Sequence, residues 1–382
     1  MPELIRSVRA LAETIGPRPA GSAAEAAAAG YVRERWESLG LTVQEETFRT
    51  VTTFSWPQGA VYLLGVAAGL ATLLRPAAGM LLGLAAVILF WGEVDGPAWV
   101  SRLLARATSR NLWTRIPPRE QPRRTLVISA HLDSSRAAAA FDPRRVQLFR
   151  ATFLGVAAGM AGVPLLAAAA LGWPGIAPAA LLPTAYLAAT AALLGQRELG
   201  FRFVPGANDN ASGAAVLLGL AEGLRTAAPT RLEVWLLATG AEEAGLMGMR
   251  AFLQRHGPEL PDAWFLNLDN LGRGELVYTT AEGMLRPHPT APELQAAARR
   301  AADRLGISAR PHAFRTMSTD ALPALARGLP AMSILALDER NLLPDWHWYT
   351  DVADNVDAGN LEDARRWCLG LVEELDARCD GG

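Results

Sequence analysis

The sequence predicts an α/β protein, a three-layer α/β/α domain over a mixed, mostly parallel sheet, into which two hydrophobic helical hairpins are inserted. Strand-length apolar runs alternate with amphipathic helical segments through the second half of the chain. Polar residues of the kinds that bind metals follow several of these runs, where open α/β sheets build their sites. Two pairs of long, nearly uncharged segments interrupt the alternation and supply the hairpins.

Composition excludes several classes of protein. The chain has 382 residues, 51% of them hydrophobic and 19% charged, which favours a large core and a partly lipid-facing surface. A formal net charge of −2 offers no basic field, so nucleic acid is excluded as a partner. There is no lysine, so an arginine at any one position says little. Cys368 and Cys379 share one predicted helix with roughly 16 Å of rise between them, too far for a disulfide.

The N-terminal part is predicted to begin with two helices. They cover residues 2–15 and 23–39; Ser22 caps the second and Gly40 ends it. Strands follow at residues 42–48, 111–116 and 125–130, the last two antiparallel because their link is short. After the second hairpin, helices are predicted at residues 212–225, 246–256, 291–305 and 361–378, and strands at 232–238, 264–268, 275–278 and 331–335.

The hydrophobic segments form two predicted hairpins. The first pairs residues 59–74 with 77–91, and the second pairs 153–173 with 176–195. The later helices, of about 20 residues, can cross a ~30 Å hydrocarbon layer, whereas the first two, near 16 residues, are somewhat short. An interfacial aromatic belt is suggested by the tryptophans at the segment ends, Trp56, Trp91, Trp99 and Trp173. The alternative is a pair of Ala-rich hairpins buried against the protein or against a partner subunit.

The domain organisation follows from these insertions. One domain is predicted to comprise residues 1–55, 93–150 and 196–382, and the inserts are residues 56–92 and 151–195. No N-terminal signal peptide is expected, because the first apolar run follows a polar region with helices of its own.

Five scattered side chains have the chemistry of a metal site: His131, Asp209, Glu243, Asp269 and His347. Two imidazoles and three carboxylates suit zinc better than calcium, and they fit two ions if one carboxylate bridges. Glu242, next to a ligand, is the candidate general base, and Asp133 is placed to orient His131. Alone, a Glu-Glu pair is usually a solvated helix start and a histidine between tryptophans packs in an aromatic cluster. The complete set favours the metal site.

Seven motifs in one order extend the pattern: Arg18-Pro-Ala-Gly-Ser22, Ala130-His-Leu-Asp-Ser134, Gly206-Ala-Asn-Asp-Asn-Ala-Ser-Gly213, Gly240-Ala-Glu-Glu-Ala-Gly-Leu-Met-Gly248, Asn267-Leu-Asp269, Thr319-Asp320 with Gly328-Leu-Pro-Ala331, and residues 347–357. With them the sequence resembles the co-catalytic zinc exopeptidases of the bacterial leucyl aminopeptidase and aminopeptidase Y type, relatives of glutamate carboxypeptidase and glutaminyl cyclase. The resemblance covers nearly all of the chain outside the inserts. It departs at Ala321, where many relatives have histidine after the aspartate, and in the long stretch between Asp133 and Asp209.

The resemblance implies a zinc-exopeptidase fold and specific residue roles. One zinc ion would be held by His131 and Asp269, the other by Glu243 and His347, and Asp209 would bridge them. Glu242 would be the general base, the peptide bond between Asp209 and Asn210 would be cis, and Asp351 is a candidate to support the ligands. The implied activity is that of a metallo-exopeptidase, most simply an aminopeptidase. The alternatives are a glutaminyl-cyclase-like acyltransferase with one zinc and a non-catalytic membrane scaffold of the same fold.

The expected partners are a peptide or protein terminus close to the membrane and the lipid bilayer itself. Both inserts should leave the sheet from the edge that holds His131, so the mouth of the site should face the membrane. Arginines flank the apolar runs on the catalytic side, whereas Arg75 alone lies in the turns, so a multi-pass protein of the cytoplasmic membrane with a cytoplasmic catalytic domain is expected. The oligomeric state has no signature in the sequence.

Overall fold

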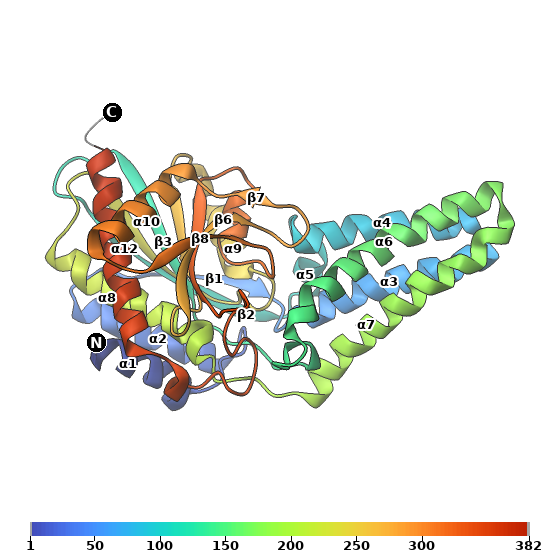
Figure 1. Cartoon of the computed structure of the whole chain (residues 1–382), viewed down its shortest axis with the longest axis horizontal. Helices are drawn as coiled ribbons and strands as arrows, with labels where there is room; N and C mark the ends of the chain where they lie inside the picture. Colours follow the sequence, from blue (N-terminus) through green and yellow to red (C-terminus); the bar gives the residue numbers. More distant parts are fainter. Residues whose placement is uncertain (1, 380–382) are drawn as a thin grey trace.

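The computed structural model describes residues 2–379, and a nine-stranded mixed sheet forms its centre (Figure 1). Met1 and residues 380–382, at the ends of the predicted domain, lie outside the described residues. The strand order is β1-β2-β4-β3-β5-β9-β6-β7, with β8 paired to β6. The strands are β1 Gln44–Thr50, β2 Ala107–Ile116, β3 Arg124–His131, β4 Leu232–Thr239, β5 Trp264–Leu268, β6 Glu275–Glu282, β7 His288–Pro289, β8 Ala309–Phe314 and β9 Ala331–Leu337.

The middle of the sheet is parallel. β3 pairs in parallel with β4 and β5, and β5 pairs in parallel with β9, whereas β1 with β2 and β2 with β4 are antiparallel. β5 and β9 are buried at every residue, as strands covered on both faces must be. β2 and β3 do run in opposite directions, but they are not neighbours, because β4 lies between them.

Helices cover both faces of the sheet, and this confirms the predicted three-layer α/β/α fold. Successive strand residues point to opposite faces. Leu126 and Ile128 of β3 pack with α1, α2, α8, α10 and α12, whereas Val127 packs with α9 and α11. The bounds are α1 Pro2–Arg9, α2 Ala23–Ser38, α5 Trp99–Leu104, α8 Gly213–Thr226, α9 Met247–His256, α10 Pro292–Leu305, α11 Leu322–Leu325 and α12 Ala358–Arg378.

Local capping places the helix starts. The Ser22 hydroxyl accepts the Glu25 amide at 3.1 Å, as predicted, and the Asp357 carboxylate accepts the Gly359 amide at 2.7 Å at the start of α12. α5 and β8 are absent from the predicted elements. α5 has only six residues, and β8 contains Pro311 and is largely exposed or half-exposed, so neither carries a clear periodic pattern.

The inserted segments form a bundle of four long helices that projects from one end of the sheet domain (Figure 1). They are α3 Ser55–Leu74, α4 Pro76–Val94, α6 Phe149–Gly172 and α7 Leu181–Gly200. α3 and α4 have 20 and 19 residues, longer than the apolar runs indicated, because the polar residues at their ends remain helical. Within residues 2–379, four helices are therefore long and apolar enough to cross a membrane.

Small residues let these helices approach each other closely. A side chain at Gly69 of α3 would collide with Thr184 of α7, and one at Gly83 of α4 would press against Pro164 of α6. At the base of the bundle, the buried Arg197 of α7 donates to the hydroxyls of Thr53 (2.8 Å), Ser55 (3.0 Å) and Ser135 (3.1 Å). Both hairpins are thereby fastened to the loop that follows β3.

Candidate metal centre

The predicted site residues lie together at the carboxyl ends of the parallel strands. His131 is the last residue of β3, the Glu242–Glu243 pair follows β4, and Asp269 follows β5. Asp209 lies in the turn before α8, and His347 lies in the loop between β9 and α12. Parallel strands that end at one edge bring their following residues together, so residues more than 200 positions apart meet here.

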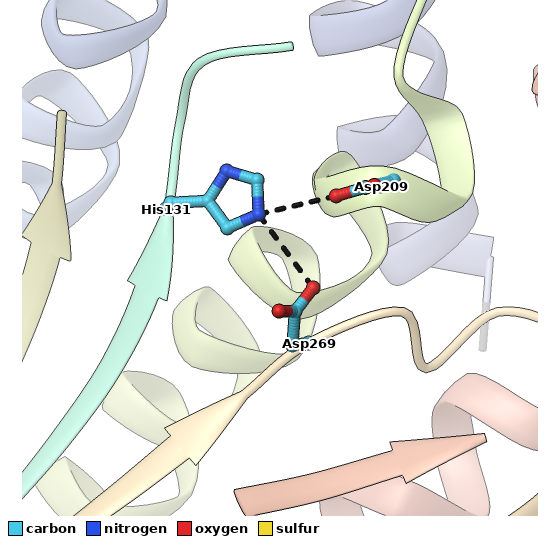
Figure 2. A group of neighbouring side chains, drawn as sticks. All are labelled: His131, Asp209 and Asp269. Carbon is cyan, nitrogen blue, oxygen red and sulfur yellow. Dashed lines mark ion pairs between the residues drawn. The ribbon is translucent and has the colours of Figure 1, made fainter. Parts of the chain in front are cut away.

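The five candidate ligands form two groups that share Asp209. In the first group, His131 Nε2 lies 3.2 Å from Asp209 Oδ1 and 3.6 Å from Asp269 Oδ1 (Figure 2). In the second, His347 Nε2 lies 3.2 Å from Asp209 Oδ2 and 2.9 Å from Glu243 Oε1. Within each group, all of the candidate ligand atoms lie within 4.8 Å of one another. One Asp209 oxygen therefore faces each group, which is the arrangement a bridging carboxylate needs.

Several of these atoms are buried and make no hydrogen bond within the described part of the chain. They include Asp209 Oδ2, Glu243 Oε1, Asp269 Oδ2 and His347 Nε2. Buried polar atoms are normally paired, because an unpaired one loses its hydration without compensation. Two imidazoles and three carboxylates are a donor set that zinc accepts. The residues therefore fit two divalent cations on either side of Asp209.

The electrostatics of the cluster are dominated by burial and by crowded carboxylates. Burial, together with neighbouring carboxylates, raises the pKa of Glu242 well above its usual range despite the opposing effect of His131. Burial alone would raise the pKa of Asp209, but the imidazoles of His131 and His347, each 3.2 Å from one of its oxygens, outweigh burial and lower that pKa. Burial lowers the pKa of His347, yet Glu243 and Asp209 raise it overall to about 9. This concentration of negative charge in a dry site attracts cations.

Asp133 contacts both the candidate ligand His131 and the backbone of the Glu242–Glu243 pair. Its carboxylate lies 3.5 Å from His131 Nδ1, the ring nitrogen that faces away from the candidate ligands, and its backbone carbonyl lies 3.2 Å from the same atom. The two carboxylate oxygens also accept the backbone amides of Glu242 and Glu243, each at 3.0 Å. Asp133 can therefore orient His131, as predicted, and it also fixes the turn that carries the glutamate pair, which was not predicted.

Glu242 lies beside the ligand groups but belongs to neither. Its side chain is buried, and its Oε1 makes no hydrogen bond to the described residues. A carboxyl group placed in this way is available to exchange a proton with a molecule bound in the site.

Asp351 holds the backbone at Asp209 in place through hydrogen bonds. Its carboxylate accepts the Asn208 amide at 2.5 Å and the Asp209 amide at 3.2 Å. Burial and the Asp209 charge raise the pKa of Asp351 to about 8. The peptide bond between Asp209 and Asn210 is cis, as the resemblance implied, and the Asn210 side chain donates to the Leu268 carbonyl at 2.8 Å.

Two further residues that hold the site were not given a role from the sequence. The fully buried Arg18 donates to the carbonyls of Leu132 (2.7 Å) and Gly206 (2.9 Å), and so joins the loops that carry Asp133 and Asp209. Glu25 accepts the amide of Ala241 at 2.8 Å and the hydroxyl of Ser109 at 2.8 Å. The available signals were the Arg18 motif and the Ser22-x-x-Glu25 capping-box pattern.

Replacing Asp351 by alanine is expected to weaken metal binding by about 10- to 100-fold, because residues that support ligands typically have effects of this size. Two buried amides that orient Asp209 would lose their acceptor. Zinc titration against a competing chelator measures the change. The matched control is Asp354→Ala, since Asp354 lies three residues along the same loop and pairs with Arg9 on the surface. Equal affinities in the two variants would contradict the supporting role.

Residues 190–372 match peptidase family M28. The chain contains a peptidase family M28 domain. The M28 match begins within α7 and includes Asp209, Glu242, Glu243, Asp269 and His347, while His131 and Asp133 lie before it. The resemblance to the co-catalytic zinc exopeptidases is confirmed.

Solved structures share the fold around the M28 domain. A zinc aminopeptidase from Bacillus subtilis is 16% identical with a TM-score of 0.58, covering 98% of this chain and 94% of its own. A glutaminyl cyclase from Bacteroides thetaiotaomicron, bound to N-acetylhistamine, is 16% identical with a TM-score of 0.59, covering 97% of each chain. A Zn-dependent exopeptidase from Parabacteroides distasonis is 15% identical with a TM-score of 0.57, again covering 97% of each chain. The search of curated proteins found no match.

Proposed function

We propose that this protein is a zinc-dependent metallo-exopeptidase of the aminopeptidase type, anchored in a membrane by its two hairpins. The proposal rests on the two ligand groups that share Asp209 and on Glu242, which lies beside these groups without belonging to either. All of these residues except His131 lie in the M28 match. The zinc aminopeptidase and the Zn-dependent exopeptidase among the structural neighbours support the same activity.

His131 and Asp269 would hold one zinc ion and Glu243 and His347 the other, with Asp209 between them. Two such ions polarise a scissile carbonyl, lower the pKa of water and stabilise negative charge that develops on oxygen.

The chain's own residues supply the proton transfers and the positioning. Glu242 accepts the proton of the attacking water and returns it to the departing amine, as a general base and then a general acid. Its burial suits this role, because a raised pKa lets a carboxyl hold a proton near neutral pH. Asp133 fixes the backbone of Glu242 and Glu243, so the base and the neighbouring ligand keep their positions relative to each other. Burial of the whole cluster excludes bulk water from these transfers.

The two alternatives fit the geometry less well. A cyclase with one zinc needs one ligand group, whereas here the second group is complete and shares Asp209 with the first. A scaffold that lost catalysis would have no need to keep five buried ligands and an adjacent carboxyl group together.

Zinc quantification on the detergent-purified protein, paired with aminoacyl fluorogenic substrates, tests the proposed activity. The expected result is two zinc ions per chain and release of amino acids from free, but not N-acetylated, termini. One zinc ion with cyclisation of an N-terminal glutamine would favour the cyclase. A zinc-loaded protein that turns over neither class would contradict both enzymes.

Membrane anchoring is supported by the outer surface of the bundle. Many large apolar side chains of its helices are exposed, among them Leu63, Leu74, Leu81, Ile88, Leu165, Leu171 and Leu182. Trp56, Trp91 and Trp99 lie exposed near the base of the bundle and Trp173 at its far end, as two interfacial belts would. A water-soluble protein rarely exposes so large an apolar surface.

The distribution of arginines supports a cytoplasmic catalytic domain. Arg75 lies at the far end of the bundle, whereas the base and the strands beside it carry Arg102, Arg106, Arg110, Arg115, Arg144, Arg145, Arg150, Arg197 and Arg202. Protease treatment of spheroplasts should therefore leave the catalytic domain intact. Its digestion from outside would contradict this orientation.

A further inference from the structure

A cavity of about 240 Å³ lies between the metal centre and the base of the helical bundle. Glu242, Glu243 and His347 line its catalytic side. The inserted helices line the other side, through Gln58 and Tyr62 of α3, Phe153 and Val156 of α6, and Thr190, Leu193 and Leu194 of α7. The bundle therefore forms part of the wall of the site, in addition to any contact with lipid.

The wall that the inserts supply is mainly apolar, with Gln58, Thr152 and Thr190 as its uncharged polar members. Tyr62 and Val156 are buried core residues of the bundle, and Phe153 packs against Phe90 with a ring separation of 5.8 Å. Phe141, in the loop after β3, stacks on Phe149 at 5.2 Å and meets the His347 ring edge-on at 4.5 Å. An unbroken aromatic contact thus runs from a candidate metal ligand to the start of α6.

Apart from the residues of the metal centre, the charged groups that line the cavity are Glu93 and Arg250, and both are paired. Glu93 accepts the Val100 amide at 2.7 Å and the Ser101 hydroxyl at 2.5 Å. Arg250 donates to the carbonyls of Gly245 at 3.0 Å and of Gly96. Neither side chain is placed to attract a charged substrate group into the cavity, so an apolar ligand suits it best.

We infer that the inserted hairpins form the specificity pocket of the enzyme, and that this pocket takes the bulky apolar side chain next to the cleaved bond. The inference rests on the proposed exopeptidase function. Pockets for drug-sized ligands measure about 300 to 1,000 Å³, so a cavity of about 240 Å³ suits one large side chain rather than a whole peptide. The preferred substrates are peptides whose terminal residue is large and apolar, such as leucine or phenylalanine.

Aminoacyl substrates that differ only in the terminal side chain test this pocket. For the zinc-loaded wild-type protein, kcat/KM for phenylalanine or leucine should exceed that for alanine by at least about tenfold, because each extra methylene in an apolar pocket contributes about 10- to 200-fold. Val156→Trp would fill the cavity from α6, and it should lower the phenylalanine-to-alanine ratio by about tenfold or more with zinc content unchanged.

Two further variants make the test decisive. Leu194→Ala widens the cavity and should shift the preference toward larger side chains, so the test does not depend on how well a tryptophan is accommodated at position 156. Leu165→Trp is the matched control, because Leu165 lies on the same helix with 69% of its surface exposed. Its selectivity should equal that of the wild type. Identical ratios in the wild type, Val156→Trp and Leu194→Ala would overturn the inference, whereas a zinc-loaded wild type that hydrolyses no substrate would overturn the proposed function.

Discussion

Replacing Glu242 by glutamine is expected to lower kcat by about 100- to 10,000-fold and to leave the bound zinc unchanged, the range usual for loss of a general base. Glutamine keeps the shape of the side chain but cannot accept the proton of the attacking water. The metal should remain, because Glu242 belongs to neither ligand group. Steady-state kinetics with a saturating aminoacyl substrate and metal analysis of the same preparation measure the two quantities.

The control for this substitution is Glu339→Gln, which makes the same chemical change on an exposed loop after β9. Its kcat and zinc content should match those of the wild type. Undiminished turnover in Glu242→Gln would remove Glu242 as the base, and a parallel loss of zinc would show that it acts as a ligand instead.

Replacing Asp209 by alanine should abolish turnover and lower the zinc content further than any other single ligand substitution. Each ligand group contains one oxygen of this carboxylate, at 3.2 Å from His131 in one group and 3.2 Å from His347 in the other. Its loss would leave each ion with only two protein ligands, fewer than the three that catalytic zinc sites usually keep. Zinc per chain, measured after dialysis at a fixed free zinc concentration, should fall from two toward none.

Two single-group variants provide the comparison. Asp269→Ala removes a ligand from the first group only, and His347→Ala removes one from the second only. Each should retain close to one zinc ion. If Asp209→Ala retained as much zinc as these two variants, Asp209 would not be a bridge.

The regular elements of the sheet domain were predictable because their sequences carry a strong local pattern. β5 is an apolar run interrupted only by Asn267 and followed by Asp269, and the structure gives it the predicted limits, Trp264–Leu268. α2 begins after Ser22 because that side chain satisfies a free amide at the helix start. These signals lie within a few residues of the feature that they specify.

The order of the strands and the ends of the helices were harder to predict from the sequence. The short link between β2 and β3 fixes their opposite directions, but nothing local indicates that β4, about 100 residues later, will lie between them. α3 begins at Ser55 because its polar first turn lies at the base of the bundle, where Ser55 accepts a hydrogen bond from Arg197. Hydrophobicity alone could not find that boundary.

The candidate metal ligands could be recognised from their residue types, whereas the residues that hold the ligand-bearing loops in place could not. His131, Asp209 and Asp269 stand out because polar residues after buried strands need a reason. The contacts of Arg18 and Glu25 connect loops far apart in the sequence, so no local window contains them. The residues that line the apolar cavity are also far apart in the sequence, since the cavity depends on how α3, α6 and α7 pack against the catalytic loops.

The position of β4 sets an order for the assembly of the protein. β2 and β3 are synthesised before the second hairpin, and β4, which must pair with both, is synthesised after it. Until β4 is synthesised, β2 and β3 each keep the edge that will pair with it exposed. Exposed strand edges favour aggregation. If the hairpins insert into a bilayer, as we propose, the nascent chain must reach that bilayer before β4 can complete the sheet. Protection of the early strands during this interval should then govern how much of the protein folds correctly.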